Sequence, residues 1–285
     1  MQKTREESGG LHERRTIRPG RAAAVCAAIL LCLWSGYHLW QILSEDIHSR
    51  SVLHSLQAYV SSPDETASAG GGGSRADGTS QSGSSSATGA PGAKSGIAVD
   101  FAGLEAACPD VKAWIHIPGT NISHPVLQAA DNSWYLTHGP DGRENRAGSI
   151  FLDSRCLPDF GSVNSVIYGH RMNNGTMFAG LHAFKDVSFR EAHPYIYLST
   201  PEGEQRCRIF EVSETDSALS SPAFQTVFDG AASVRAWLSE PAGELVYMFA
   251  DPGHPATVRV LTLSTCVRGD AGRRLIVRAV WEPGL

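Results

Sequence analysis

The chain has 285 residues, of which 42% are hydrophobic and 19% are charged. This composition excludes a wholly disordered or collagen-like chain and supplies enough apolar residues for a sizeable core. The formal net charge of -5 argues against a general nucleic-acid-binding protein, which would normally carry a basic domain. Six cysteines are too few for a disulfide-dense scaffold of this length.

The N-terminal part predicts a membrane anchor. Residues 1–21 are basic, and residues 22–43 contain no Asp, Glu, Lys or Arg over a length close to the ~20 residues that a helix needs to cross the hydrocarbon layer. By the positive-inside rule, the basic segment before this run and the acidic pair Glu45 and Asp46 after it predict a cytoplasmic N-terminus and an extracellular remainder. We expect an uncleaved transmembrane helix, because the apolar region of a cleaved signal peptide is shorter.

Two further segments precede the predicted domain. Apolar residues recur near helical spacing in residues 44–60, which predicts a juxtamembrane helix, most simply a frayed one without a function of its own. Residues 61–96 are rich in Gly and Ser, a composition typical of a flexible linker. We therefore expect a loose tether between the membrane and a folded domain formed by residues 97–285.

The predicted domain is mainly β. After a short helix around residues 101–108, eight short apolar segments are separated by turn signals, at residues 113–117, 149–152, 162–168, 195–198, 207–212, 245–249, 258–263 and 275–281. Eight short strands in one domain indicate a β-barrel or a β-sandwich. One helix is expected to interrupt them, because apolar residues recur at helical spacing from Phe224 to Leu238 after the helix-start signal Ser221-Pro222. Gly230 is the weak point of this predicted helix.

One cysteine is a candidate nucleophile. Cys266 ends a strand-like run and faces a predicted loop, where a scaffold can expose a reactive thiol. Cys108, Cys156 and Cys207 are interpreted as small core residues, or as containing one incidental disulfide.

A histidine and an arginine complete the candidate site. His170 follows a predicted strand and a Gly turn, so it occupies a strand end as Cys266 does. Arg273 and Arg274 begin the strand after Cys266, and in an antiparallel hairpin one of them would lie beside the thiol. Strand alternation sends the two arginines to opposite faces and by itself does not choose between them.

These residues resemble the motifs of a known family, the sortases. The run Thr-Leu-Ser-Thr-Cys at residues 262–266, with Tyr-Gly-His upstream at 168–170 and Arg-Leu-Ile-Val downstream at 274–277, is similar to the sortase signature. Residues 113–120, 125–128, 131–132, 148–153 and 175–178 are similar to class B sortases in particular. The chain departs from class B in having Ala113 where Gly is common and in the length of its Gly/Ser segment.

The resemblance implies a fold and a reaction. The fold would be an eight-stranded sortase-type β-barrel with short peripheral helices. Cys266 would attack the Thr carbonyl of a C-terminal sorting motif, and His170 would act as acid and then as base. Arg274 would hold the substrate and stabilise the oxyanion, because the family pattern of an Arg followed by three apolar residues fits it better than Arg273.

The resemblance also implies partners. Asn132, Ser264 and Thr265 would contact the substrate, and the chemistry requires neither a metal nor a cofactor. The substrates would be secreted proteins with a C-terminal sorting signal, and the acceptor would be an amine of a peptidoglycan precursor or of a pilin. No nucleic acid is expected as a partner.

Three alternatives stand beside this interpretation. An L,D-transpeptidase also places a His before a Cys in a β-rich domain, but its Cys normally follows a Gly, whereas Thr265 precedes Cys266 here. A papain-like peptidase is disfavoured because its Cys precedes its His along the chain. A catalytically inactive surface scaffold, in which Cys266 is merely packed, is the alternative from another functional class.

Overall fold

The computed structural model describes residues 19–61, 94–218, 220–248 and 258–282, and within the first helix the side chains of residues 27–38, 40, 44 and 47–57. The chain divides into two compact units between Ile47 and His48. The elements are, in chain order, α1 (Pro19–Gln57), β1 (Val60–Ser61), β2 (Ala98–Val99), α3 (Phe101–Ala107), β3 (Val111–His116), β4 (Ser123–Leu127), α4 (Trp134–Thr137), β5 (Ile150–Leu152), β6 (Asn164–Tyr168), η1 (Phe178–Lys185), α5 (Val187–Ala192), β7 (Tyr195–Thr200), β8 (Gly203–Asp216), η2 (Pro222–Phe224), α6 (Gly230–Ser239), β9 (Glu244–Met248), β10 (Val260–Val267) and β11 (Asp270–Trp281).

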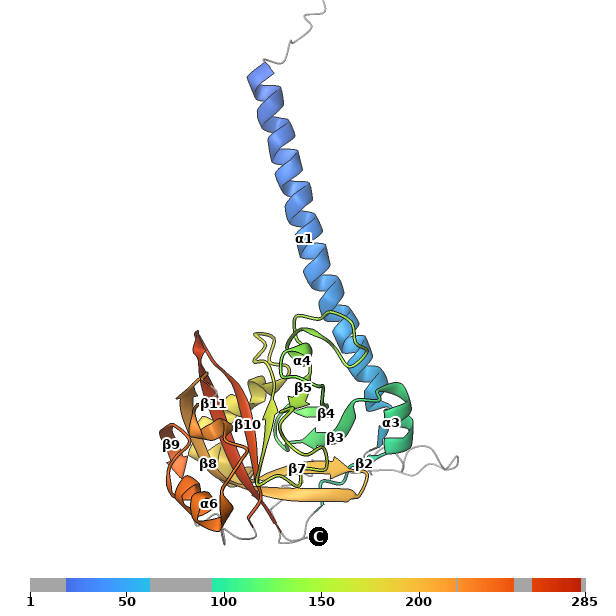
Figure 1. Cartoon of the computed structure of the whole chain (residues 1–285). Helices are drawn as coiled ribbons and strands as arrows, with labels where there is room; N and C mark the ends of the chain where they lie inside the picture. The colour runs from blue at the N-terminus through green and yellow to red at the C-terminus, as the bar shows by residue number, and fades with distance from the viewer. Residues whose placement is uncertain (1–18, 62–93, 219, 249–257, 283–285) are drawn as a thin grey trace, which may run out of the picture. The chain divides into compact units, whose positions relative to one another are not determined.

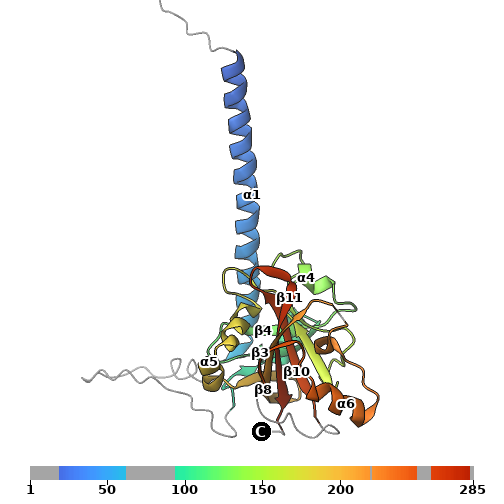
Figure 2. The same cartoon turned by 90° about the vertical axis from the view of Figure 1, so that its left-hand side faces the viewer.

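Eight strands close into a barrel. They pair in the order β11, β10, β6, β5, β4, β3, β7 and β8, and the pairing of β8 with β11 closes the ring. Strand β10 pairs in parallel with β6 and antiparallel with β11, and Figures 1 and 2 show β10 and β11 side by side along one wall. The predicted eight-stranded, mainly β fold is confirmed.

The membership of the ring differs from the prediction in one strand. All eight predicted segments contain strands, but among the strands of the described residues β9 pairs with β8 alone and lies outside the ring. Its place is taken by β4, which the sequence did not reveal because Pro125 lies in the middle of it, and a proline is depleted in strands. Pro125 is tolerated opposite Trp114 of β3.

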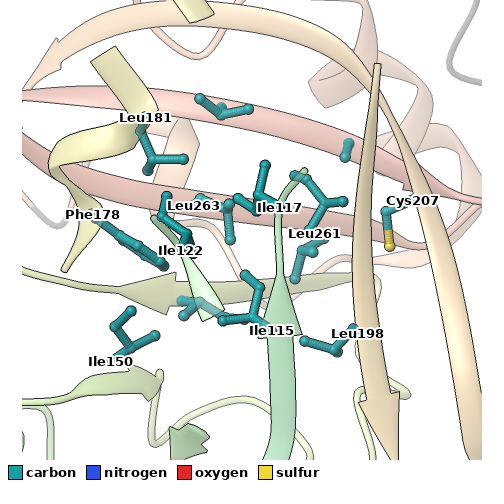
Figure 3. Close-up of a cluster of buried hydrophobic side chains, with 14 of the residues drawn as sticks. Ile115, Ile117, Ile122, Ile150, Phe178, Leu181, Leu198, Cys207, Leu261 and Leu263 are labelled. Atoms are coloured by element: carbon teal, nitrogen blue, oxygen red, sulfur yellow. The ribbon is translucent and has the colours of Figure 1, made fainter. Parts of the chain in front are cut away.

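The barrel is filled by apolar side chains that alternate along its strands. In β10, Leu261 and Leu263 point inward, where they meet Ile115 and Ile117 (Figure 3). Alternation therefore sends Thr262, Ser264 and Cys266 to the outer face of the same strand. That outer face is covered beside β6 and β11 by a smaller apolar cluster, which contains Ala223 and Phe224 of η2.

The end of α1 packs on the barrel unit. Leu56 is buried in a cluster with Leu104 of α3 and Trp114 of β3, and Val52 packs against the same cluster. The helix end is therefore not frayed, as we had expected of a juxtamembrane helix, because these apolar side chains are removed from water.

The two flanks of the Gly/Ser-rich segment are paired with each other. Val60 of β1 lies opposite Val99 of β2, and the amide of Asp100 donates to the carbonyl of Tyr59 at 2.8 Å. Residues 62–93, which form most of the predicted linker, lie outside the described residues. The two strands that flank this segment therefore lie side by side, and the flexible linker stays a prediction.

Among the described residues, we find no helix whose length and apolar character would let it cross a membrane. The transmembrane helix predicted at residues 22–43 is therefore not confirmed by the fold.

The predicted helix from residue 222 to 238 is wrong in its extent. The chain instead forms η2 and α6, with extended backbone at Gln225 between them. Gly230 has a φ of 79°, a left-handed conformation that interrupts the helical pattern. Val227 is 76% exposed, so it does not belong to the core stripe that the spacing indicated.

Candidate active site

The β10–β11 hairpin brings a thiol and a guanidinium together. Cys266 and Arg274 are direct cross-strand partners, and the strand register shifts immediately after Cys266. Arg274 Nη1 donates a hydrogen bond to Cys266 Sγ at 3.2 Å. Because both residues lie on the outer face of the barrel wall, this pair is accessible from outside the core.

Arg273 lies apart from the thiol. Its guanidinium contacts two carboxylates, Glu244 at 2.7 Å and Glu214 at 3.4 Å. Strand alternation therefore resolves what the sequence left open between the two arginines, since it is Arg274 that faces Cys266.

His170 reaches the same point from strand β6. The parallel pairing sets Tyr168 opposite Ser264, and the amide of Gly169 donates to the carbonyl of Ser264 at 3.2 Å. His170 follows directly, and its Nε2 bonds to the carbonyl of Leu136 at 2.8 Å. Because a carbonyl only accepts, Nε2 carries the proton, and Nδ1 is the nitrogen left to exchange a proton with Cys266.

The electrostatics favour the charged forms of both groups. The hydrogen bond with His170 is the largest influence on the pKa of Cys266 and, together with the positive charge of Arg274, it lowers that pKa against the opposing effect of burial. The same hydrogen bond raises the pKa of His170, although burial opposes it. A thiolate beside an imidazolium is the reactive form of a nucleophilic cysteine.

The other cysteines of the domain are in the opposite situation. Burial raises the pKa of Cys108 and of Cys156 to about 11, and it also raises the pKa of Cys207. All three are buried and, like the other cysteines that the structure describes, they are free. They are core residues, as one of the two sequence interpretations held, and the described cysteines form no disulfide.

A cavity of about 200 Å³ opens beside the thiol. The cavity is lined by all six residues that the sequence indicated, namely Asn132, His170, Ser264, Thr265, Cys266 and Arg274. It is also lined by six residues that the sequence analysis did not assign to the site, namely Leu136, Phe151, Tyr168, Gly169, Ser217 and Phe224. Within the described part of the chain, the buried hydroxyls of Ser264 and Thr265 have no hydrogen-bond partner.

Asn132 has a structural contact as well. Its side-chain oxygen accepts from the amide of Ser154 at 2.8 Å, so it also fixes the loop after β5. A second histidine near the thiol, His182, was not singled out from the sequence, and its Nε2 donates to the carbonyl of Cys266 at 3.0 Å. His182 lies in η1 between apolar residues, and nothing in its sequence surroundings distinguishes it from a core histidine.

A sortase domain model matches residues 115–282, which is more than half of the chain. The chain belongs to the sortase family. The family consists of cysteine transpeptidases, and this membership agrees with the resemblance of the motifs around His170, Cys266 and Arg274 and not with an L,D-transpeptidase or a papain-like peptidase.

Curated sortases are similar to the chain over much of its length. Sortase B of Listeria monocytogenes is 34% identical over 157 residues, which cover 55% of this chain and 63% of the Listeria protein. Sortase B of Staphylococcus aureus is 29% identical over 181 residues, covering 63% of this chain and 73% of that protein. The chain thus spans somewhat less than two thirds of the Listeria sortase.

Solved sortase structures share the fold. The X-ray structure of Clostridium perfringens sortase B superposes with a TM-score of 0.60 at 31% identity, over 64% of this chain and all of that one. A Staphylococcus aureus sortase B–substrate complex gives a TM-score of 0.59 at 28% identity, over 65% of this chain and 85% of that one. These relatives are class B sortases, so the resemblance to class B is confirmed.

Proposed function

We propose that this sortase is a membrane-anchored transpeptidase of the cell surface, which cleaves a C-terminal sorting motif of secreted proteins and joins the new Thr end to an amine. The proposal is supported above all by one observation, the convergence of the Cys266 thiol, the His170 ring and the Arg274 guanidinium on one cavity. A thiol, an imidazole and a guanidinium in this arrangement can cleave a peptide bond of a substrate and transfer the acyl group to an amine.

The first half-reaction forms a thioester. The Cys266 thiolate attacks the carbonyl carbon of the substrate Thr, and the carbonyl oxygen gains the negative charge. The guanidinium of Arg274 is a permanent donor beside the sulfur and stabilises this oxyanion. The imidazolium of His170 then gives its proton to the amine of the departing peptide, and the C–N bond breaks.

The second half-reaction transfers the acyl group. Neutral His170 takes a proton from the acceptor amine, whose nitrogen attacks the thioester carbon. The C–S bond breaks, an amide forms, and the thiolate and imidazolium are restored. The acceptor is an amine of a peptidoglycan precursor or of a pilin, and Asn132, Ser264 and Thr265 contact the sorting motif.

A peptide-transfer assay on the whole chain in detergent tests this activity. We expect turnover of peptides from a library of Thr-containing sorting motifs when an amine acceptor is present, and loss of turnover in Cys266→Ala and His170→Ala. Cys32→Ala is the matched control, because Cys32 is an exposed free cysteine in α1 and should keep wild-type activity. Turnover that survives in Cys266→Ala, or a wild-type protein without turnover, would contradict the proposal.

Membrane anchoring is supported by the sequence and by the surface of α1. Residues 22–43 lack charged side chains, and large apolar side chains in α1 are more than half exposed, namely Ile29, Leu30, Leu31, Leu33, Trp34, Tyr37 and Trp40. An apolar surface on all sides of a helix is typical of a helix in a lipid environment. We expect the full chain to resist carbonate extraction from membranes, and a variant without residues 22–43 to be released.

A further inference from the structure

A buried carboxylate next to the cavity has no part in the reaction steps above. Asp153 directly follows β5 and is 0% exposed. An unpaired carboxylate is strongly disfavoured in such a place, so its partners decide what it does. The described contacts give it partners from several segments of the chain.

Two of these partners line the cavity themselves. Tyr168, at the end of β6, donates its hydroxyl to Asp153 Oδ2 at 2.8 Å. The side-chain oxygen of Asn132, from the loop after β4, accepts from the amide of Ser154, the residue next to Asp153, at 2.8 Å. Asp153 and its neighbour thus join two cavity residues that lie 36 positions apart in the sequence.

A third partner extends the network to η2. Arg155 donates two hydrogen bonds to the Asp153 carboxylate, from Nε to Oδ1 at 2.9 Å and from Nη2 to Oδ2 at 2.7 Å. The same Nη2 donates to the carbonyl of Phe224 at 3.1 Å, and Phe224 also lines the cavity. The ring centroids of Phe224 and Tyr168 lie 5.8 Å apart. The hydrogen bond from Arg155 and this ring contact therefore fix the same side of the cavity.

The charge state of Asp153 is consistent with this arrangement. Burial raises the pKa of its carboxyl, but the hydrogen bonds from Arg155, Asn132 and Tyr168 outweigh burial and lower the pKa below its ordinary value. An ionised acceptor makes stronger and more directional hydrogen bonds than a neutral one. The wall is therefore held by charge-assisted bonds.

We propose that Asp153 is a positioning residue that fixes the wall of the substrate cavity formed by Asn132, Tyr168 and Phe224, and thereby sets how tightly a peptide is held. The inference rests on the proposed function for the nature of the ligand. None of the contacts of Asp153 described above involves the Cys266 thiol, the His170 ring or Arg274. Its loss should impair peptide binding and leave the intrinsic reactivity of the thiol unchanged.

The experiment compares two thiol reagents on the full-length protein in detergent. Iodoacetamide is small and reports on Cys266 alone, whereas a peptidyl chloromethyl ketone that ends in Thr must occupy the cavity. A set of such peptidyl reagents, which differ in the residues before Thr, is first tested on the wild type. The reagent that labels Cys266 fastest is then used for the variants. Labelling of Cys266 is read by mass spectrometry of its peptide.

Tyr168→Phe is the principal variant, because it removes one hydroxyl and retains the ring contacts. We expect labelling by the peptidyl reagent to slow about tenfold, as for the loss of one buried hydrogen bond to a charged group, with iodoacetamide labelling unchanged at every pH. Arg155→Lys and Asp153→Asn should act in the same direction, and Asp153→Asn should act more strongly. Asp159→Asn is the matched control, since Asp159 accepts only from the exposed loop amide of Gly161 in the described contacts.

Two results would overturn the inference. Equal labelling rates in wild type and Tyr168→Phe would show that the wall needs no such support, and a parallel loss for both reagents would show that the network acts on the thiol itself. If Asp153→Asn does not fold, Tyr168→Phe and Arg155→Lys still decide the matter. Turnover of sorting peptides by the wild type judges the proposed function separately, because neither labelling reaction requires turnover.

Discussion

Cys266 differs from the other cysteines of the barrel unit in the groups that surround its sulfur and not only in how far its side chain is buried. Burial is the largest influence on the pKa of Cys108 and of Cys156 and raises it, whereas Cys266 has a guanidinium and an imidazole beside its sulfur, and its pKa is lowered. Burial disfavours a thiolate, and a nearby positive charge favours it. The three residues that we propose for the reaction could be singled out in the sequence, because each stands at the end of a predicted strand.

The two adjacent arginines should differ sharply in their effect on activity. Arg274→Ala removes the donor beside the sulfur, and we expect kcat/KM for a sorting peptide to fall by about 10² to 10³, as for the loss of an oxyanion donor. Arg273→Ala breaks only partly exposed ion pairs with Glu214 and Glu244, which contribute little because solvent screens them, so activity should stay within about threefold of the wild type. Steady-state kinetics of the two variants check this, and equal losses would contradict the assignment.

The pH dependence of thiol alkylation should report the same interactions. The hydrogen bond with His170 and the charge of Arg274 lower the pKa of Cys266, so removing either partner must raise that pKa and move the alkylation midpoint to higher pH. His170→Ala should shift the midpoint further than Arg274→Ala, because the hydrogen bond is the larger influence. Iodoacetamide labelling rates between pH 5 and about 10 measure the midpoint. An unchanged midpoint in both variants would refute this view of the site, and Arg273→Ala is the control.

Other residues of the site had no sequence signal. His182 and Asp153 are noticed only once η1 and the loop after β5 are seen to approach β10 and β6, since their partners lie 84 and 15 positions away. The ion pair of Arg278 with Glu211 at 2.7 Å, in which both side chains are 0% exposed, had no sequence signal either. Contacts between distant segments are set by tertiary packing, which periodicity does not contain.

At the scale of elements, the end of β6 depends on one glycine. A Cβ added to Gly169 would lie 2.7 Å from the ring of Phe178 and 3.2 Å from the side chain of Ile150, both of which are buried. The amide of Phe178 also donates to the carbonyl of His170 at 2.9 Å, so the ring has little freedom to retreat. Gly169 thus allows η1 to pack closely behind His170.

Gly169→Ala should therefore displace His170. We expect a loss of about 1–3 kcal/mol in the free energy of unfolding, typical of an overpacked core, and a loss of kcat/KM greater than that of any surface variant. Gly161→Ala is the matched control, because the nearest atoms to its added Cβ belong to the exposed side chain of Asp159, at 3.0 Å or more. Thermal unfolding and peptide turnover measure both effects, and a Gly169→Ala protein that matches the control would refute the packing argument.

The elements themselves were predictable to different degrees. The strands with apolar alternation were predicted near their observed positions, whereas β4 was missed because of Pro125. The predicted helix after Ser221 failed where Gly230 turns the backbone and where Trp237 Nε1 donates to the carbonyl of Pro222, which ties α6 to η2 in a separate position. Both failures are cases in which a tertiary contact outweighs a local preference.

At the scale of the whole molecule, the pairing of β1 with β2 makes a prediction about stability. Residues 62–93 connect two strands that touch, so the segment closes a loop whose entropy opposes folding. Shortening it about fourfold should stabilise the protein by about 1 kcal/mol, which corresponds to a rise in Tm of about 2–4 °C. Activity on a soluble peptide should not change.

The alternative gives a different result. If the Gly/Ser segment were a tether between independent parts, its length would not affect the unfolding of the barrel unit, and Tm would stay the same. Thermal unfolding of the full-length protein and of the shortened variant decides between the two. A matched variant in which an equal number of Gly and Ser residues is added should lower Tm by a smaller amount, since the closure entropy grows only with the logarithm of loop length.

The strand pair also determines what happens when the segment is cut. Segments rich in Gly and Ser are common targets of proteases. After a cut in residues 62–93, the pairing of β1 with β2 and the burial of Leu56 against Leu104 and Trp114 would still join the two pieces. We therefore expect the nicked protein to consist of two covalent pieces that stay associated, so that a cut in this segment does not release residues 48–61 from the barrel.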